Sequence, residues 1–224
     1  MAAENPFETR FHEYDAWYDE HSSLFESELR AIRSVLPLSY PGDTRRVEIG
    51  VGSGRFAQAL EIPLGVEPAG GIATLARARG IEVLDGRAED LPLPDASLDY
   101  AFLITVLCFI EDVTEAFTEI DRILAPRGRL ILAFLPADSP LGRAHTASEE
   151  PDTFLRHASL RTRRETLAAL SGGGFRIERS AHTLTSLSNG GDRRPERPSP
   201  GWVGGSFAVI SACRQRSAGS NQRP

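Results

Sequence analysis

The ten-residue stretch VEIGVGSGRF, residues 47–56, constrains the fold of this chain more than any other segment. It starts as an apolar strand with one acid, Glu48, and leads into residues typical of a helix. Between them, Gly50, Gly52 and Gly54 occupy every second position. Glycines directly after a strand let the backbone approach a ligand closely. The stretch therefore predicts a strand, a ligand-binding loop and a helix in succession.

Apolar strands and amphipathic helices alternate along the chain around this loop. Strands are predicted over 45–51, 62–68, 81–86, from 98 onward and over 129–135, and helices over 21–37, 55–60, 69–80, 111–128 and 161–175. Strands that are apolar on both faces and separated by helices favour a mostly parallel sheet covered on both sides. Two later strands, 175–184 and 205–212, are predicted to form an antiparallel pair. Ligands bind such sheets outside the carboxyl ends of the strands.

The spacing of the glycines argues against a dinucleotide cofactor. A dinucleotide loop has the pattern G-x-G-x-x-G, and its third glycine would fall where this chain has Arg55. The acid at Glu48 would also repel a pyrophosphate at close range. The loop is better suited to a ligand that carries positive charge.

Three motifs in order, VEIGVGSG, GVEP and GRAEDLPLPDASLDYAF, resemble the class I, seven-stranded S-adenosylmethionine-dependent methyltransferases, and among them the small-molecule, type 11-like subgroup. The resemblance covers about residues 7–213 and implies S-adenosyl-L-methionine as the cofactor. It also implies an α/β, Rossmann-like, doubly wound sheet of seven mostly parallel strands with the last one antiparallel. One departure is that only 13 residues carry Gly54 to Glu67, so the first crossover helix is predicted to be about a turn short.

The resemblance assigns roles in cofactor binding to particular residues. The Glu67 carboxylate would accept hydrogen bonds from both ribose hydroxyls, and the Ala88 amide and Glu89 side chain would recognise adenine. Glu48 would help to hold the cofactor ammonium, the three glycines would pass under the methionine and ribose, and Thr105 would complete the site. The structural alternatives are a surface acid at Glu67, a plain strand-to-helix turn at the glycines and a solvated loop acid at Glu89.

The residues that contact the methyl acceptor are predicted less specifically than those that bind the cofactor. The segment LITVLCFIED, residues 103–112, meets the acceptor in this fold family, so residues 105–108 are candidate pocket walls, and Cys108 is assigned no catalytic role. The aromatic segment FHEYDAWYDEH, residues 11–21, lies over the cofactor as a lid in related enzymes. Tyr14 and Tyr18 would then face the methionine end or the acceptor, where an aromatic ring can attract a sulfonium. The alternative is an ordinary amphipathic helix docked on the sheet.

Charge and composition limit the partners. The net charge of −6, from 25 basic and 31 acidic residues, disfavours broad attraction to nucleic acid or an anionic membrane. Cys108 and Cys213 are the two cysteines and offer neither a disulfide framework nor a zinc spacing, and no metal site is expected. No apolar run is long enough for a membrane span, so a cytoplasmic protein is expected. Two arginine clusters, 161–164 and 193–197, are interpreted as solvated helix or loop faces.

The predicted organisation has an N-terminal helical lid over 1–40, a methyltransferase domain over 41–213 and a disordered tail over 214–224. The predicted function is methyl transfer from S-adenosylmethionine to a small-molecule acceptor by in-line displacement. Two alternatives stay open: a regulatory protein that binds the cofactor without turnover, and a nicotinamide-dependent oxidoreductase. The variable stretch 186–200 is a candidate to shape the acceptor pocket. Neither the acceptor nor the oligomeric state is indicated.

Overall fold

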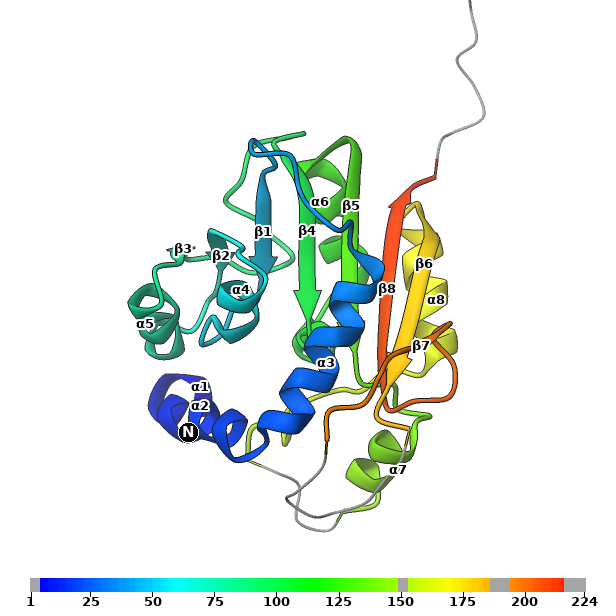
Figure 1. Ribbon diagram of the computed structural model, residues 1–224. Helices are drawn as coiled ribbons and strands as arrows, with labels where there is room; N and C mark the ends of the chain where they lie inside the picture. Colours follow the sequence, from blue (N-terminus) through cyan, green and yellow to red (C-terminus); the bar gives the residue numbers. More distant parts are fainter. Residues whose placement is uncertain (1–4, 149–152, 186–193, 216–224) are drawn as a thin grey trace, which may run out of the picture.

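A computed structural model describes residues 5–148, 153–185 and 194–215. It contains one sheet with the strand order β3-β2-β1-β4-β5-β8-β6-β7 (Figure 1). The strands are β1 (Arg46–Ile49), β2 (Leu64–Val66), β3 (Glu82–Leu84), β4 (Leu98–Ile104), β5 (Leu124–Phe134), β6 (Phe175–Thr183), β7 (Ser199–Pro200) and β8 (Phe207–Arg214). The first five strands pair in parallel, and β8 runs antiparallel to both β5 and β6. The predicted doubly wound sheet with a reversed last strand is confirmed.

The sheet has one strand more than the seven expected. The additional strand, β7, is two residues long and pairs with Ala181 and His182 at the edge of β6. It lies at the end of the Gly/Pro/Arg-rich stretch 186–200, where no strand is predicted. Because it forms only an edge pairing, it leaves the order of the seven main strands unchanged.

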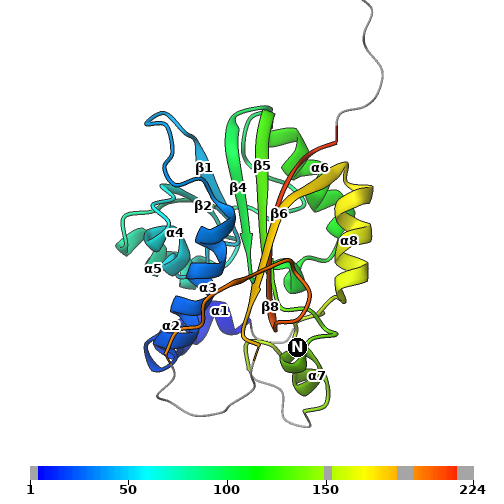
Figure 2. The same ribbon diagram turned by 45° about the vertical axis from the view of Figure 1, so that its right-hand side comes forward.

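Helices cover both faces of the sheet (Figure 2). In chain order, the described helices are α1 (Pro6–Thr9), α2 (Phe11–Glu20), α3 (Ser22–Val35), α4 (Arg55–Ala59), α5 (Gly70–Ala78), α6 (Val113–Ile123), α7 (Pro140–Thr146) and α8 (Arg163–Gly172), with a 3₁₀ turn η1 (Leu107–Phe109). Alternate residues of each central strand point to opposite faces. Leu130 and Leu132 pack in the core beneath α6 and α8, whereas Ile131 and Ala133 pack in the core beneath α3 and α4.

The first crossover helix is short, as the sequence predicts. The helix α4 spans five residues and buries Phe56. Two aromatic rings from the N-terminal helices pack against Phe56. The ring centroids of Phe25 and Tyr18 lie 4.9 Å and 6.0 Å from the Phe56 centroid. The N-terminal helices therefore supply the packing that a longer crossover helix would otherwise give.

The chain termini depart slightly from the predicted boundaries. At the N-terminus, α1 and α2 lie near the carboxyl ends of the parallel strands rather than in a layer on the sheet (Figure 1). At the C-terminus, β8 continues past Cys213 to Arg214, whose guanidinium pairs with the Asp121 carboxylate. Residues 216–224 of the expected tail lie outside the described residues.

Among the helices that the structure describes, none is both long and apolar enough to cross a bilayer.

Candidate active site

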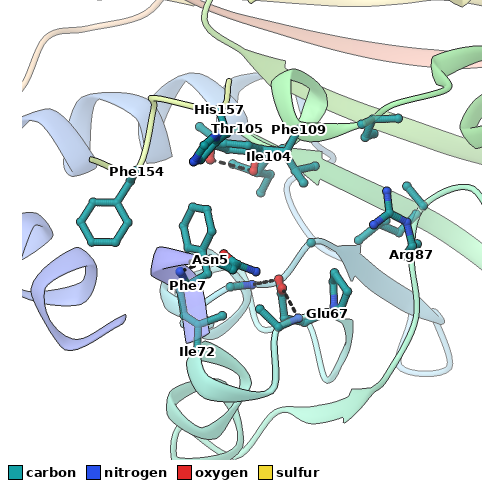
Figure 3. A pocket seen from close by; sticks show the side chains of 18 of the residues that line it. Asn5, Phe7, Glu67, Ile72, Arg87, Ile104, Thr105, Phe109, Phe154 and His157 are labelled. Carbon is teal, nitrogen blue, oxygen red and sulfur yellow. Dashed lines mark hydrogen bonds between the residues drawn. The ribbon is translucent and has the colours of Figure 1, made fainter. Parts of the chain in front are cut away.

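A cavity of about 370 Å³ lies at the carboxyl ends of β1, β2 and β4 (Figure 3). Its floor and sides come from the glycine loop, the residues after β2 and β3 and the end of β4, and its cover comes from the N-terminal segment. It is lined by Asn5, Pro6, Phe7, Tyr14, Ile49, Gly50, Gly52, Glu67, Pro68, Ala69, Ile72, Gly86, Arg87, Ala88, Glu89, Ile104, Thr105, Val106, Phe109, Ile110, Phe154 and His157. We refer to it as the cofactor cavity.

The three loop glycines all have positive φ, but they make different contacts. Gly50 has φ +71°, and a Cβ there would collide with the Val106 side chain. Gly52 lines the cavity and donates its amide to Glu67. Gly54 does not line the cavity; a Cβ on it would lie 2.9 Å from Ala76 Cα, so it allows the start of α4 to pack tightly on α5. Gly54 therefore has a packing contact in this structure, and its predicted role under the cofactor stays a prediction.

Glu67 lies at the end of β2 with its carboxylate directed into the cavity (Figure 3). Its Oε2 accepts from the Gly52 amide at 3.0 Å, and its Oε1 accepts from the Ala69 amide at 2.9 Å. Burial raises the pKa of Glu67, and these two amide hydrogen bonds act in the opposite direction. Each oxygen retains acceptor capacity, which is what a ribose diol requires.

The segment after β3 contributes a second wall of the cofactor cavity. Ala88 and Glu89 both line it, as predicted for an adenine site. The Glu89 carboxylate also accepts from the Glu111 amide at 2.9 Å, so this acid is already held by the loop before α6. Glu89 is therefore an ordered wall residue and not a solvated loop acid.

Glu48 is buried beneath the loop and does not line the cavity. The Ala57 amide of α4 donates to its carboxyl group. Burial, together with the nearby Glu67 charge, raises the pKa of Glu48 well above its usual range. The side chain therefore faces α4, and its predicted contact with the cofactor ammonium stays a prediction.

A second, larger cavity of about 960 Å³ adjoins the first. It is mostly apolar, and its walls come from elements that are far apart in the sequence. It is lined by Tyr14, Trp17, Tyr18, Glu20, His21, Ser22, Ser23, Leu24, Ser27, Glu28, Thr105, Leu107, Cys108, Phe109, Phe134, Leu135, Leu141, Ala144, His145, Phe154, Leu155, Leu160, Arg161, Leu184, Arg194 and Glu196. We refer to it as the acceptor cavity. Tyr14, Thr105, Phe109 and Phe154 line both cavities and so form their boundary.

Thr105 stands at this boundary with an unusual backbone. Its φ is +56°, which is strained for a β-branched residue. The conformation is held because its amide donates to Ala133 at 2.8 Å and its hydroxyl donates to the Ile104 carbonyl at 2.8 Å. Strained residues of this kind concentrate at functional sites.

The residues predicted to contact the acceptor gather around the acceptor cavity. The Tyr14 and Tyr18 hydroxyls lie 3.1 Å apart, and burial raises the pKa of Tyr14 to about 12. Cys108 lines the same cavity, and burial raises its thiol pKa to about 12. The thiol is therefore protonated at neutral pH, in line with the absence of a predicted catalytic role. Residues 186–193 of the candidate variable stretch lie outside the described residues, but Arg194 and Glu196 line the cavity.

Ion pairs hold the N-terminal helices over the site, and sequence reasoning missed them. Arg55 binds Asp15 at 2.7 Å and Asp19 at 2.8 Å, and Arg79 binds Asp15 at 2.8 Å. Burial raises the pKa of Asp15, but hydrogen bonds from Arg55, Arg79 and Ser53 outweigh it and lower the pKa to about 2. The available signal was the i, i+4 spacing of the two aspartates on one face of α2.

A second attachment joins α1 to α5. The Glu8 carboxylate accepts from the Gly70 amide at 2.9 Å and the Gly71 amide at 2.8 Å, at the N-terminus of α5. A carboxylate is favoured there because the helix dipole is positive at that end. The backbone approach is close enough that a Cβ on Gly71 would collide with Glu8. Two separate contacts therefore attach the N-terminal segment beside the cofactor cavity, and its role as a lid stays a prediction.

Glu28 is the other residue that sequence reasoning missed. It lies on α3, is 6% exposed and lines the acceptor cavity. Burial raises its pKa to about 8. An acid at an inward position of an amphipathic helix, directly before the core residue Leu29, was the available signal.

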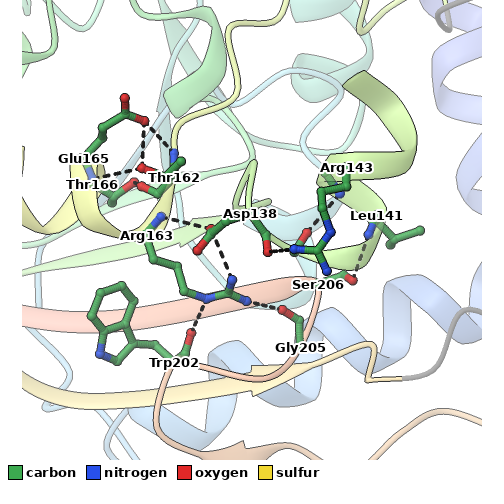
Figure 4. A network of polar contacts seen from close by, with 12 residues as sticks. Asp138, Leu141, Arg143, Thr162, Arg163, Glu165, Thr166, Trp202, Gly205 and Ser206 are labelled. Carbon is green, nitrogen blue, oxygen red and sulfur yellow. Dashed lines mark hydrogen bonds and ion pairs between the residues drawn. The ribbon is translucent and has the colours of Figure 1, made fainter. Parts of the chain in front are cut away.

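Within the first arginine cluster, Arg163 does not lie on a solvated face, whereas Arg164 is exposed. Arg163 is 9% exposed, pairs with Asp138 at 3.2 Å and donates to the Trp202 and Gly205 carbonyls (Figure 4). In the same region, the Leu141 amide of α7 donates to Ser206 Oγ at 3.2 Å. The solvated-face interpretation was wrong here because the guanidinium joins three segments that are distant in sequence. The network fixes α7, whose Leu141 lines the acceptor cavity.

The sheet order, the glycine loop after β1 and the acid after β2 define the class of S-adenosylmethionine-dependent methyltransferases. The family model described as a methyltransferase domain matches residues 47–132. A Thermotoga maritima crystal structure, described as a SAM-dependent methyltransferase and possible histamine N-methyltransferase, is similar at 36% identity. It covers 94% of this chain and 98% of that one, with a TM-score of 0.84.

Two curated proteins are also similar to this chain. An uncharacterised protein of Methanocaldococcus jannaschii is 31% identical over 208 residues, which are 93% of this chain and 98% of the relative. A malonyl-[acyl-carrier protein] O-methyltransferase of Methylococcus capsulatus is 29% identical over 183 residues, which are 76% of this chain and 65% of the relative. The chain belongs to the S-adenosylmethionine-dependent methyltransferases, and its cofactor is S-adenosylmethionine.

Proposed function

We propose that the protein transfers the methyl group of S-adenosylmethionine to a small organic acceptor bound in the acceptor cavity, by in-line displacement. The observation that carries this proposal is the pair of adjoining cavities with four shared wall residues. One cavity contains the glycine loop and Glu67, and the other is mostly apolar. A methyl group at the shared wall would be accessible from both sides.

S-adenosylmethionine supplies a methyl group that is already electrophilic because it is attached to a sulfonium. The protein therefore has mainly to align the acceptor and to exclude water. Glu67 would hold the ribose, and Ala88 with Glu89 would hold the adenine. The aromatic ring of Tyr14, at the boundary of the cavities, would favour the positive sulfonium by about 0.5–2 kcal/mol.

The dimensions and charge of the molecule support a small acceptor. The acceptor cavity, at about 960 Å³, lies within the range of about 300–1,000 Å³ common for small-molecule sites. The net charge of −6 does not favour binding to a nucleic acid. The Thermotoga maritima relative is described as a possible N-methyltransferase of an amine, so amines are the first acceptor class to test.

The direct test has two parts. First, isothermal titration calorimetry should detect binding of S-adenosylhomocysteine to the purified protein. Second, the protein should transfer labelled methyl from S-adenosylmethionine to a component of a metabolite extract, and mass spectrometry should identify the product. Tight cofactor binding without transfer to any extract would instead support the non-catalytic alternative. Thermal stabilisation by nicotinamide dinucleotides but not by S-adenosylhomocysteine would overturn the proposal.

A further inference from the structure

Glu28 is an ionisable side chain buried at the wall of an apolar cavity. It projects from α3, is 6% exposed, and lies next to Ser27 and Leu29, which are also buried. Within the ranges that the structure describes, its carboxylate forms neither an ion pair nor a side-chain hydrogen bond. The side chains of Tyr14 and Tyr18, from α2, lie near enough to interact with its charge.

The other ionisable groups around the acceptor cavity do not neutralise Glu28. These groups are Tyr14, Tyr18 and Glu20 on α2, His21 between α2 and α3, Cys108 on η1, His145 on α7, and Arg161, Arg194 and Glu196 on loops. Arg161 donates to the carbonyls of Leu107 and Ile110 at 3.1 Å and 3.3 Å. Arg194 and His21 are exposed. None of the described cations is paired with Glu28.

An unpaired carboxyl in such a position is unfavourable in the absence of a ligand. Burial disfavours the ionised form and raises the pKa of Glu28 to about 8. A leucine would fill the same position on an amphipathic helix without that penalty. Buried ionisable groups facing a cavity are candidates for a functional role for this reason.

We propose that Glu28 binds the basic nitrogen of the methyl acceptor, so that the acceptor is a primary or secondary amine with an apolar body. This inference rests on the proposed function. The aromatic and aliphatic walls of the cavity, among them Trp17, Phe134 and Leu155, would hold the apolar body. The carboxylate would pair with the ammonium, and the rings of Tyr14 and Tyr18 would add cation–π attraction. An acidic acceptor would gain no such pairing with Glu28.

The proton balance of the reaction also fits this position. The acceptor enters as an ammonium, and the Glu28 carboxylate takes one proton from it, which leaves a neutral amine with a free electron pair. The nitrogen then forms a bond to the methyl carbon while the sulfur–carbon bond breaks and its electron pair stays on sulfur. The product is an N-methyl ammonium, and the Glu28 proton returns to solvent. A carboxyl whose pKa lies near the working pH is suited to this exchange.

The test uses the full-length protein loaded with S-adenosylhomocysteine. The probes are 2-phenylethylamine, the neutral 2-phenylethanol and the acidic phenylacetate, titrated by calorimetry at pH 7.5. The variants are wild type, Glu28→Gln and the control Glu26→Gln. Glu26 is on the same helix and pairs with Arg30 at 2.8 Å instead of lining the cavity.

We expect the amine to bind wild type at least tenfold more tightly than the alcohol, and the acid to bind more weakly than either. Glu28→Gln should weaken amine binding by tenfold or more, change alcohol binding by less than threefold and leave the affinity for S-adenosylhomocysteine unchanged. Glu26→Gln should behave as wild type.

A second measurement uses only the wild type, so it tests the inference even if Glu28→Gln does not fold. Titration of the amine in buffers of different ionisation enthalpy should show release of close to one proton at pH 7 and much less at pH 9. The inference is overturned if the amine binds no better than the alcohol, or if no proton is released at pH 7. It is also overturned if the extract assay shows methylation of an oxygen, sulfur or carbon atom only. Failure to bind S-adenosylhomocysteine would instead overturn the proposed function.

Discussion

The cofactor cavity and the acceptor cavity are built in different ways. The cofactor cavity depends mainly on backbone amides and a few acids at the ends of neighbouring strands, between residues 49 and 110, with further walls from the N-terminal segment, Phe154 and His157. The acceptor cavity is built from side chains of α2, α3, η1, α7 and several further segments, from Tyr14 to Glu196. Only the first arrangement leaves a motif in the sequence. The difference explains why the methyl donor is evident and the acceptor is not.

The largest effect on cofactor binding is expected at Glu67. Glu67→Ala removes the carboxylate that would bind both ribose hydroxyls, and charge-assisted hydrogen bonds contribute about 1.5–3 kcal/mol each. The dissociation constant of S-adenosylhomocysteine should therefore rise roughly 100-fold, measured by calorimetry. Glu82→Ala, which changes an exposed acid on the neighbouring strand, is the control. An equal affinity in the two variants would show that the cofactor cavity does not depend on this acid.

The next prediction tests whether the cofactor cavity depends on the close approach of the backbone at Gly50 to Val106. Gly50→Ala places a Cβ against Val106 at a φ of +71°, and it should lower the free energy of unfolding by roughly 1–3 kcal/mol. Chemical denaturation measures this change. Gly42→Ala is the control because a Cβ there has no neighbour within 4 Å. Similar unfolding midpoints for both variants would contradict the close approach inferred from the structure.

A change in stability is also expected for a substitution at Glu28 in the acceptor cavity, but this substitution should stabilise the folded protein at high pH. The pKa of Glu28 is raised to about 8 in the folded protein from 4.5, so the folded state binds more protons than the unfolded state between these values. Stability contributed by protonated Glu28 is present below about pH 4.5 and lost as the pH rises through 8. Glu28→Gln should therefore stabilise the protein by roughly 3–5 kcal/mol at pH 9 and by less than about 1 kcal/mol at pH 5.

Thermal unfolding at the two pH values measures this difference, with Glu26→Gln as the control. A Glu28→Gln protein that is less stable than wild type at pH 9 would mean that the carboxylate has a stabilising partner. The acceptor cavity would then be a packed region of the protein and not a site prepared for a charged ligand.

The smallest effect concerns the ion pairs that hold the lid. Asp15→Asn weakens the contacts with Arg55 and Arg79, and the dissociation rate of S-adenosylhomocysteine should increase roughly three- to tenfold, which corresponds to about 1 kcal/mol. Stopped-flow fluorescence of Trp17 measures the rate. Glu13→Gln, which alters an exposed pair with Arg10 on the same helix, should change it little.

The contribution of Asp15 to the free energy of unfolding should fall at low pH. The pKa of Asp15 is lowered to about 2 from 3.8, so its contribution to stability is present above about pH 4 and lost as the pH falls through 2. The difference in unfolding free energy between wild type and Asp15→Asn should shrink across that interval. A constant difference would show that Asp15 is not the titrating group.

Much of the fold was predictable because its signals are local. The apolar strands, the helix caps and the glycine spacing each involve residues within one turn or one strand of each other. The same holds for Glu67, which follows a strand and precedes Pro68. The edge strand β7 was not predictable, because its pairing with Ala181 and His182 depends on where β6 ends in space.

The sequence by itself predicted the class of sheet, the cofactor through the family resemblance, and an acid after β2 as the candidate ribose ligand. The tertiary structure alone decided that Arg163 is buried against Asp138, that Arg55 pairs with Asp15 of α2, and that Glu28 lines the acceptor cavity. The physical reason is the range of the interactions. Local hydrogen bonds and periodic burial are recorded in neighbouring residues, whereas a cavity or an ion pair between distant segments exists only after the chain has brought them together.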